Sequence, residues 1–501
     1  MVTLNKIKKS VLSIVSYGII ARVLTFFKGI LLAYYIGSNY EMDSYLVAFS
    51  LTMLLTKIIS EGLTISLVPK LQESHRKEGL DGRNRLANNM INSFSILSLI
   101  LILIGFIIAP LAIKAHGPGL VGEEFLRGVK LFRIGIFIVT FEFIRAILLG
   151  YLQSLHRFKA GPKSGVANPL IYIIYLVALS KYFGLEGLMI AGIIAIIAQI
   201  YIVYKACLKD GYKYKFYIAL RDKQFTGTLT FLLPVMINIV INEIILTVNK
   251  TMGSVLEKGT IAQLNYANDI ITLIVGIFIA AFVIAIYPIL AENYDDNEYK
   301  NLKQTINDSL KIIALIAISV AIILITLSVP IVRLFYERGD FGYDATIITA
   351  GFLRYYAIGI IGTSMILLLI RIFYAIRDLK SPIIFGIMSL VMNVILNYLL
   401  IKIIGAKGIA LGTSLSVIIT AIYGICSLNF KLKFILWKDM FMKLCKYILA
   451  GIIMALIITI IYTLLSGVFG NTLIGNLVLI LISALPGIAI FGRIIWRIER
   501  Q

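Results

Sequence analysis

The sequence predicts an all-α polytopic membrane protein of about 14 transmembrane helices, with two parallel six-helix lobes around a central cavity and two additional C-terminal helices. Three observations predict this fold. Of 501 residues, 59% are apolar and only 15% are charged, whereas soluble domains are about half apolar and about a quarter charged. The apolar residues form runs of about 20, long enough to cross about 30 Å of hydrocarbon as helices. The sequence also contains an internal repeat of two copies, and each copy holds six of these apolar runs.

The apolar runs, taken in chain order, define the predicted spans. Two stretches within them, Leu97–Pro110 and Ile312–Val329, contain no charged residue. The basic N-terminus leads into a run that is too long and too interrupted for a cleaved signal peptide, so we expect it to be retained. The predicted spans cover residues 11–36, 43–69, 88–113, 128–153, 164–183, 187–206, 227–250, 263–290, 307–329, 346–370, 382–403, 406–427, 444–466 and 474–494.

Positive charge alternates from one predicted loop to the next. Even-numbered loops and both tails hold roughly 30 Lys and Arg residues, against about nine on the other side, which is the positive-inside pattern. Most of the formal net charge of +21 therefore reports membrane orientation rather than nucleic-acid binding. Both termini are expected on the cytoplasmic side.

Short strings recur at an offset of about 220 residues, which indicates a duplicated six-span unit. Because six is even, both copies enter the membrane from the same side, and two parallel lobes leave a cleft where transporters bind substrate. A duplicated channel is the alternative, but no Gly-rich re-entrant segment typical of a filter is visible. We expect an N-terminal lobe at 1–220, a C-terminal lobe at 221–440 and two further helices in 441–501. The matching strings are Pro69–Glu73 with Pro288–Glu292, Phe132-Arg133 with Leu353-Arg354, Phe158–Pro162 with Leu379–Pro382, and Gly184–Gly187 with Gly405–Gly408.

Several ionisable residues lie inside predicted spans, where each costs about 2.5–3.5 kcal/mol on insertion scales and is expected to face a cavity or a partner. Lys57 and Glu61 are spaced i,i+4, and Glu142 and Arg145 are spaced i,i+3. Each pair can therefore neutralise itself along one helix face. The remaining charges inside spans include Arg22, Lys28, Arg133, Asp269, Arg354 and Arg371.

Arg22 and Lys28 lie in the first span, which contains no acidic residue. Their charge must be offset by a carboxylate on another helix, by water or by an anionic substrate. A guanidinium can bond two phosphate oxygens at once, while an ammonium acts as a point charge. We expect this pair to line the cavity and contact an anion; the alternative is a buried pairing with Glu61 or Glu243.

Amide and hydroxyl side chains gather in three later spans. Asn249 lies in the seventh span, Asn393 and Asn397 lie one turn apart in the eleventh, and Thr413 lies near the start of the twelfth. Their oxygens can coordinate a cation such as Na⁺, or their side chains can hydrogen-bond neighbouring helices together. Because no carboxylate stands among them, the interhelical role is favoured. Na⁺ remains the candidate coupling ion, and no other cofactor is expected.

The sequence carries no motif of covalent catalysis. It contains no GxxxxGK[ST] loop, its three cysteines have no disulfide or metal spacing, and its three histidines are isolated. A membrane glycosyltransferase or ligase needs a sizeable outer loop with catalytic acids or histidines, and the predicted outer loops are short. We therefore expect a transporter. A cation or drug antiporter of the same fold is an alternative, with Glu61, Glu243 and Asp269 as its cavity carboxylates.

The first span also carries a recognisable string. Ala21–Lys28, followed by Gly37 and Asp43, resembles the first helix of the MurJ (MviN) family of lipid II flippases, part of the multidrug/oligosaccharidyl-lipid/polysaccharide flippase superfamily. Ser60-Glu61-Gly62 and the loop Leu334–Phe341 resemble further signatures of that family. The order of spans and the two extra helices fit as well, so the resemblance covers essentially the whole chain.

The resemblance implies that the chain exports lipid II, an undecaprenyl-diphosphate-linked peptidoglycan precursor, across the bacterial cytoplasmic membrane by alternating access. It also implies a working monomer whose partners are this substrate and membrane lipids, with no nucleic acid. The chain departs from the family's pattern at Thr56 and Asp269, where Arg is usual, which leaves another polyprenyl-linked glycan open as the substrate. By matching position, Arg22 and Lys28 would contact the diphosphate. The further candidates for the cavity are Lys57, Glu61, Asp43, Asp269 and Arg354, those for a possible cation site are Asn249, Asn393, Asn397 and Thr413, and those for the gate or signature loop are Arg338, Gly339 and Asp340.

Overall fold

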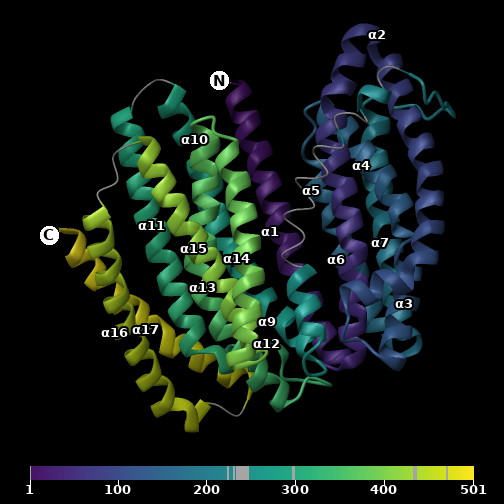
Figure 1. Cartoon of the computed structure of the whole chain (residues 1–501). Coiled ribbons are helices and arrows are strands. Elements are labelled where there is room, and N and C mark those ends of the chain that lie inside the picture. The colour runs from purple at the N-terminus through teal and green to yellow at the C-terminus, as the bar shows by residue number, and fades with distance from the viewer. Residues whose placement is uncertain are drawn as a thin grey trace. The chain divides into compact units, whose positions relative to one another are not determined.

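The structure is a computed structural model that describes residues 2–222, 225–228, 232, 247–295, 299–432, 437–469 and 472–500. These residues are almost entirely helical, and a single bridge between Arg338 and Phe341 is the one pairing of extended backbone among them (Figure 1). The chain forms two compact units, Met1–Gly259 and Thr260–Gln501. Glu243, the sequence-predicted alternative partner of the first-span cations, lies outside the described residues.

In the first unit, one helical element continues through what the sequence predicts as a loop between the second and third spans. The element α2 runs for 77 residues and bends at Gly79, which adopts φ 66° and ψ −150°. Only glycine enters this region without a steric penalty, so the residue type permits the bend. The helices of this unit are α1 (Val2–Ile36), α2 (Tyr40–His116), α3 (Gly122–Gly135), α4 (Ile138–Ser154), α5 (Ala160–Gly165), α6 (Ala167–Ala178) and α7 (Ser180–Lys209).

The second unit contains the remaining described helices, and the two C-terminal ones pack against each other and against α11. A π-helical turn joins α9 to α10 within the predicted eighth span. The elements are α9 (Thr260–Ile274), η1 (Val275–Ile279), α10 (Ala280–Asp295), α11 (Tyr299–Thr326), α12 (Ser328–Tyr336), α13 (Tyr343–Ala375), α14 (Lys380–Ile404), α15 (Lys407–Leu432), α16 (Trp437–Phe469) and α17 (Leu473–Arg500).

The predicted fold class is confirmed: the chain is an all-α polytopic membrane protein. Eleven helical segments of the described residues are long and apolar enough to cross a membrane. One of them, α2, holds two helices joined at the Gly79 bend, and its 77 residues contain both the predicted second span and the predicted third span. The predicted span at 164–183 is broken into α5 and α6, and most of the predicted span at 227–250 lies outside the described residues.

The duplicated strings fold alike in the two units. Gly184 and Gly405 both adopt positive φ, at 52° and 61°, where the turn before the next helix begins. His156 and Arg377 also share positive φ, at 58° and 60°, although neither is glycine. Non-glycine residues rarely adopt this conformation, so the repeat extends to local backbone geometry. The boundaries 220 and 440 remain predictions, since they describe a duplication rather than the present packing.

An ion pair occurs at corresponding positions in both units, with the acidic and the basic residue exchanged. In the first unit, Arg157 donates to Asp210 over 3.1 Å. In the second unit, at the same offset of about 220 residues, Asp378 accepts from Lys431. Burial alone would raise the pKa of Asp378, but hydrogen bonds from Lys431 and Ser381 outweigh it and lower that pKa to about 2. At corresponding positions, the two units therefore hold ion pairs in which the acidic and basic residues are exchanged.

We expect the exchanged pair Arg157→Asp/Asp210→Lys to fold as well as the parent, because it reproduces the polarity of the second unit. Arg157→Asp alone places two carboxylates together, and should lower stability by about 0.5–1 kcal/mol, the scale of an exposed pair. Thermal unfolding in detergent, measured for both variants and for Asp210→Lys alone, checks this. Equal losses in the exchanged and single variants would contradict it.

Candidate functional site

Lys28, one of the two first-span cations, lies against two aromatic rings. Its ammonium is 4.7 Å from the ring centroid of Tyr172 on α6 and 5.6 Å from that of Phe49 on α2. The two rings meet edge to face at 6.5 Å, and Phe49 also stacks on Tyr45 at 5.4 Å. A cation over aromatic faces is stabilised by about 0.5–2 kcal/mol, more where water is excluded. The aromatic rings therefore lower the cost of placing this charge within an apolar span.

The rings of Phe49 and Tyr172 are here called the cage of Lys28. Its geometry depends on how Tyr172 packs. This side chain is only 2% exposed. A Cβ atom at Gly192 on α7 would lie 2.4 Å from its hydroxyl oxygen, so only glycine leaves room for the ring. No local pattern in the sequence marks Phe49, Tyr172 or Gly192 as neighbours of Lys28, because they lie far from it along the chain.

Arg22, the other first-span cation, occupies a different face of α1. It is exposed, while Phe26 and Gly29, at helical spacing i+4 and i+7 from it, are buried on the same stripe. Arg22 and Lys28 are six residues apart, about 9 Å of rise and about 120° of rotation. They present positive charge at two levels and in two directions, and their joint contact with one anion remains a prediction.

Asp43 lies at the start of α2 and binds backbone. Its Oδ2 accepts a hydrogen bond of 2.6 Å from the amide of Gly259, and its side chain is buried. Gly259 has φ 85°, and a Cβ there would lie 2.3 Å from the carbonyl oxygen of Ser38. Both constraints require glycine, so Asp43 closes a contact between the beginning of α2 and residue 259. Its predicted role as a substrate ligand stays a prediction.

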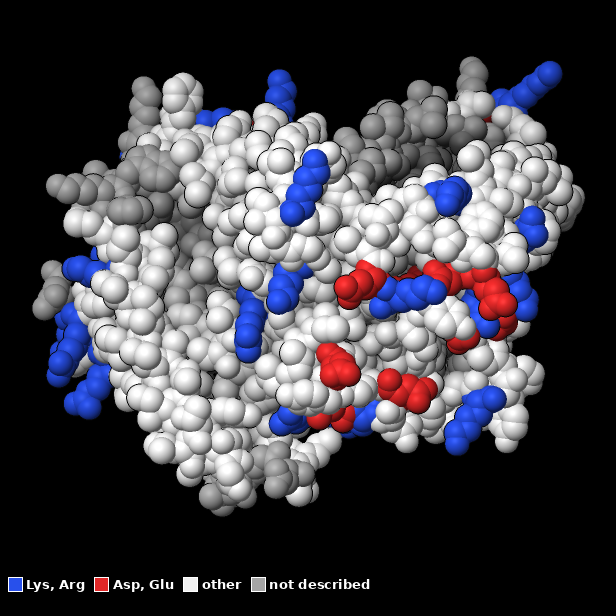
Figure 2. All heavy atoms as spheres, turned by 60° about the horizontal axis from the view of Figure 1, so that its bottom comes forward, with Lys and Arg blue, Asp and Glu red and all other residues white. Residues whose placement is uncertain are grey.

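The bond from Gly259 to Asp43 is one of several that hold residues 251–259, here called the latch segment. The hydrogen bond from Lys258 to Glu124 also raises the pKa of Lys258. Figure 2 views the chain from this end and shows acidic and basic side chains next to one another. The other latch contacts are Thr251 Oγ1 to the His116 carbonyl (2.9 Å), Gly119 N–H to Ser254 Oγ (3.2 Å) and the Lys258–Glu124 ion pair.

Lys57 and Glu61 do not pair with each other within the described residues, although their spacing allows it. Both side chains are exposed on α2. Thr56, at a position where the resembling family usually has Arg, is buried and donates to the Met53 carbonyl of its own helix. The exposed charge at this level of α2 therefore belongs to Lys57 rather than to its neighbour.

The predicted pairing of Glu142 with Arg145 is confirmed. Arg145 Nε lies 3.1 Å from Glu142 Oε2, and its Nη2 donates to Ser60 Oγ on α2 over 2.8 Å. The Glu142 side chain is 4% exposed and the Arg145 side chain is 17% exposed. This pair is therefore a buried connection between α4 and α2, beside Glu61.

The contacts of Arg133 explain why a charged residue lies within a predicted span. Pro110 has no N–H group, so it cannot bond the carbonyl four residues earlier in α2, which belongs to Phe106. Arg133 Nε donates to that carbonyl over 3.1 Å, and its guanidinium lies 4.6 Å from the Phe106 ring centroid. The charge thus satisfies a backbone group that the proline leaves without its helical partner.

In the second unit, the predicted cavity residues bind local neighbours. Asp269 accepts from Asn265 one turn earlier on α9, over 3.1 Å. Arg354 on α13 donates from Nε to Ser328 Oγ on α12, over 2.6 Å. Neither contact excludes a substrate role, which remains a prediction.

The signature loop is a tight turn that closes the end of α12. Gly339 adopts φ 60°, and Phe341 N–H donates to the Arg338 carbonyl over 3.2 Å. The Arg338 guanidinium donates back to the Leu334 carbonyl, one of the last carbonyls of the helix, whereas Asp340 is exposed. Phe341 packs against Tyr266 and Tyr336, at ring distances of 5.5 and 5.8 Å. The loop is therefore anchored on α9, and its role as a gate stays a prediction.

The amides of α14 form a chain of hydrogen bonds. Asn397 Nδ2 donates to Asn393 Oδ1 (3.2 Å), and Asn393 Nδ2 donates to Thr413 Oγ1 on α15 (3.0 Å). A Cβ at Gly412 would lie 2.2 Å from Asn397 Oδ1, so the two helices are in close contact here. This is the geometry of an interhelical connection. Asn249 lies in the first unit, and a Na⁺ site made with it remains untested.

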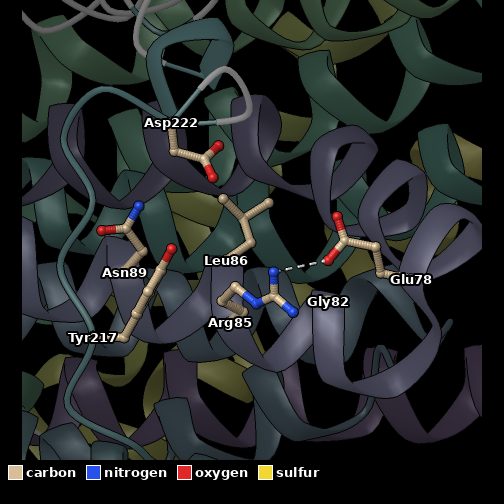
Figure 3. Close-up of a pocket in the computed structure, with 7 residues that line it drawn as sticks. All are labelled: Glu78, Gly82, Arg85, Leu86, Asn89, Tyr217 and Asp222. Carbon is tan, nitrogen blue, oxygen red and sulfur yellow. Dashed lines mark ion pairs between the residues drawn. The ribbon is translucent and has the colours of Figure 1, made fainter.

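A small polar pocket lies beside α2 in the first unit (Figure 3). Glu78 and Arg85 on its wall form an ion pair of 3.3 Å. None of the predicted cavity residues lines it. Among the described residues, no group of three His, Cys, Asp or Glu side chains converges as a metal site.

We expect Tyr172→Leu to impair transport by about 3- to 30-fold, because loss of one cation–π contact of about 0.5–2 kcal/mol releases the Lys28 ammonium from its present position. Tyr172→Phe keeps the ring and should stay within about twofold of the parent. The effect is measured as the growth of a strain depleted of its own transporter of the resembling family, when each variant is produced at the same membrane abundance. If both variants behave alike, the ring does not position Lys28.

Comparison with known proteins gives one consistent family. A family model described as lipid II flippase MurJ matches residues 32–483. A lipid II flippase MurJ of Thermosipho africanus is 28% identical over 404 residues, covering 80% of this chain and 82% of that protein. A probable lipid II flippase MurJ of Buchnera aphidicola is 24% identical over 416 residues, covering 82% and 81%.

Solved structures agree with the sequence comparisons. A structure described as lipid II flippase MurJ in an inward closed conformation matches with a TM-score of 0.80 and 27% identity, covering 96% of this chain and 98% of that one. An inward-facing multidrug resistance MATE family transporter of the MOP superfamily matches with a TM-score of 0.70 at 16% identity, covering 82% and 94%. The second likeness supports the fold alone.

Proposed function

This chain belongs to the MurJ family of lipid II flippases, and on that premise we propose that it carries lipid II from the inner to the outer leaflet of the bacterial cytoplasmic membrane by alternating access. The observation that carries the proposal is the cationic character of α1. Arg22 is exposed and Lys28 lies on aromatic rings, in a candidate span (Ser16–Ile36) that has no acidic residue. Positive charge inside a membrane span is costly, and such residues usually face a cavity or a partner. A diphosphate headgroup is such a partner, and Arg suits its oxygens.

The membrane potential can drive the cycle. A diphosphate carries about two negative charges, and each is worth about 2.3 kcal/mol per 100 mV of potential. With the inside negative, outward movement of the anion is downhill. Binding the diphosphate to Arg22 and Lys28 makes the loaded carrier nearly neutral. The empty, cationic carrier is then drawn back toward the inside.

We assign the latch segment to the outer gate. The bond from Gly259 to Asp43 holds the end of the latch segment against the start of α2 within the first unit. Opening toward the outer side requires this bond and the Lys258–Glu124 pair to break. The turn around Gly339 serves as a second closing element in the other half of the chain.

The remaining features of the proposal follow the charge pattern and the family. Both termini face the cytoplasm, a monomer is the working unit, membrane lipids and lipid II are the partners, and the chain binds no nucleic acid and catalyses no covalent reaction. Na⁺ is a secondary candidate for coupling. It would have to replace the hydrogen bond between Asn393 and Thr413, so we favour the potential as the driving force.

Two other cargoes fit the fold. Another polyprenyl-linked glycan shares the diphosphate and suits a cavity that has Thr56 and Asp269 where the family usually has Arg. A cation or drug antiporter would rely on Glu61, which is exposed, and Asp269, which is half-buried. The first-span cations favour an anionic cargo over this alternative.

Transport in vesicles tests the proposal. Purified chain is placed in liposomes with fluorescent lipid II, and accessibility of the headgroup from outside is followed with and without an imposed potential. We expect headgroup movement that speeds up when the potential favours it, and that unlabelled lipid II suppresses more strongly than other undecaprenyl-diphosphate glycans. Equal suppression by all glycans would reassign the cargo, and no movement beyond empty liposomes would refute the function.

A further inference from the structure

An asparagine ladder on α2 holds the segment that follows α7. This segment, residues 211–222, is here called the strap; it lies between the sixth span and the predicted seventh. Four buried asparagines on α2 donate their amide N–H groups to strap carbonyls. The bonds are Asn84 to Gly211 (3.1 Å), Asn88 to Lys213 (2.9 Å), Asn92 to Tyr217 (3.1 Å) and Asn89 to Ala219 (3.0 Å).

The other side of each amide is also used. The Oδ1 atoms of Asn84, Asn88 and Asn92 accept from tyrosine hydroxyls, and that of Asn89 accepts from the Ala219 amide over 2.7 Å. The tyrosines are Tyr151 (2.9 Å), Tyr212 (2.6 Å) and Tyr214 (2.8 Å). Buried backbone groups need such partners where no regular secondary structure supplies them. The ladder therefore holds the non-helical strap along α2 as far as Tyr217 at Asn92, and then back to Ala219 at Asn89.

The number of strap residues between successive asparagine bonds is not constant. Asparagines four residues apart are about 6 Å apart along a helix, which matches two residues of extended chain at about 6.6 Å. Asn84 and Asn88 follow this match, since their carbonyls belong to residues 211 and 213. From Asn88 to Asn92 the strap advances four residues, to 217, which is two more than the spacing needs. The chain between these two bonds is therefore longer than a straight path along α2 needs, and its residues 214–216 are here called the crest.

The outward face of the strap is basic and aromatic. Tyr212 is buried, whereas Lys213, Lys215 and Arg221 are exposed, and Phe216 on the crest is 76% exposed. Within the described residues, none of the three cations forms an ion pair. The acidic groups on the neighbouring pocket wall are engaged, because Glu78 pairs with Arg85 and Asp222 accepts from Phe225 N–H (Figure 3).

We propose that the strap is a lipid-binding element that recognises anionic headgroups of the cytoplasmic leaflet. Lys213, Lys215 and Arg221 would contact the headgroups, and the Phe216 ring would enter the interface. Basic residues beside an exposed aromatic ring are typical of segments that bind an anionic membrane surface. The ladder supports this by binding the strap's backbone and the Tyr212 and Tyr214 hydroxyls, while the three basic side chains and Phe216 stay exposed. The inference depends on the proposed orientation of the chain but not on its cargo.

Quenching by brominated lipids tests the proposal. The chain contains two tryptophans, so Phe216→Trp in a Trp437→Phe/Trp496→Phe background places a single indole on the crest. The full chain is reconstituted in vesicles of phosphatidylcholine and phosphatidylglycerol in which only one lipid is brominated. At equal mole fraction, we expect brominated phosphatidylglycerol to quench at least twofold more, and high salt to reduce the difference.

Matched variants show whether the strap cations cause the preference. Lys213→Gln/Lys215→Gln/Arg221→Gln should abolish it. Lys114→Gln/Lys181→Gln/Lys407→Gln removes the same number of exposed charges elsewhere and should leave it intact. Equal quenching by both lipids, no quenching by either, or a preference that survives loss of the strap cations would overturn the proposal. Native mass spectrometry of the parent and the two triple variants counts bound phosphatidylglycerol without the introduced indole, and equal counts would overturn it too.

Discussion

Arg22→Ala is expected to abolish rescue of a strain depleted of its own lipid II flippase, while the chain still inserts into the membrane. A hydrogen bond to a charged group contributes about 1.5–3 kcal/mol, so losing a guanidinium–phosphate contact should weaken substrate binding by about 10- to 100-fold. Arg22 is exposed, so removing its side chain should leave the packing of α1 largely intact. Growth after depletion, at membrane abundance matched by immunoblot, measures the effect.

Two further variants separate charge from shape at this position. Arg22→Lys keeps the charge but loses the planar fork, and should rescue growth only partly. Arg493→Ala removes another exposed arginine, from α17, and should rescue fully. Normal growth with Arg22→Ala would remove this residue from the substrate site and leave Lys28 as the only first-span candidate.

The features that follow local patterns were predictable from the sequence. Apolar runs gave the spans because a membrane helix needs about 20 apolar residues wherever it stands. The pairing of Glu142 with Arg145 was predictable because residues three apart share one helix face. The repeated glycine turns at Gly184 and Gly405 were detected as matching strings, and they share a positive φ that glycine permits.

Contacts between distant segments were not predictable in the same way. The cage of Lys28 needs Tyr172 on α6, and the partner of Asp43 is a backbone amide at Gly259. A backbone group leaves no mark of its identity in the sequence. The bond from Arg133 to the Phe106 carbonyl had a usable signal in Pro110, since a proline within a helix leaves the carbonyl four residues earlier without its usual donor. The asparagines of α2 likewise stood out only once the strap was placed beside them.

The packing of the seventh span's end differs in kind from the repeat. The repeated strings predict that residues 221–440 form one lobe, whereas residues 247–259 belong to the first compact unit. Sequence similarity records which segments descend from one ancestor, whereas the latch bonds record which segments touch in one conformation.

Arg145→Ala is expected to be the most destabilising of the charge substitutions considered, by about 3–5 kcal/mol, because it leaves the Glu142 carboxylate buried without its partner. Glu142 is 4% exposed, and Ser60 also loses the donor that connects α4 to α2. The double variant Glu142→Ala/Arg145→Ala removes both charges and should recover much of the loss. Unfolding in detergent, followed by thermal shift and by protease resistance, gives the interaction energy from the double-mutant cycle.

A more exposed ion pair serves as the control that separates the contribution of burial to the loss of stability from that of charge alone. Lys130 and Glu186 form an ion pair of 3.0 Å in the same unit, but the Lys130 side chain is 65% exposed. Lys130→Ala should therefore cost less than about 1 kcal/mol. If Arg145→Ala and Lys130→Ala unfold alike, water or a neighbouring group must reach Glu142, and this part of α4 would then face the cavity rather than the packed interior of the unit. Such a result would also bring Glu61, one residue from Ser60, into the same hydrated space.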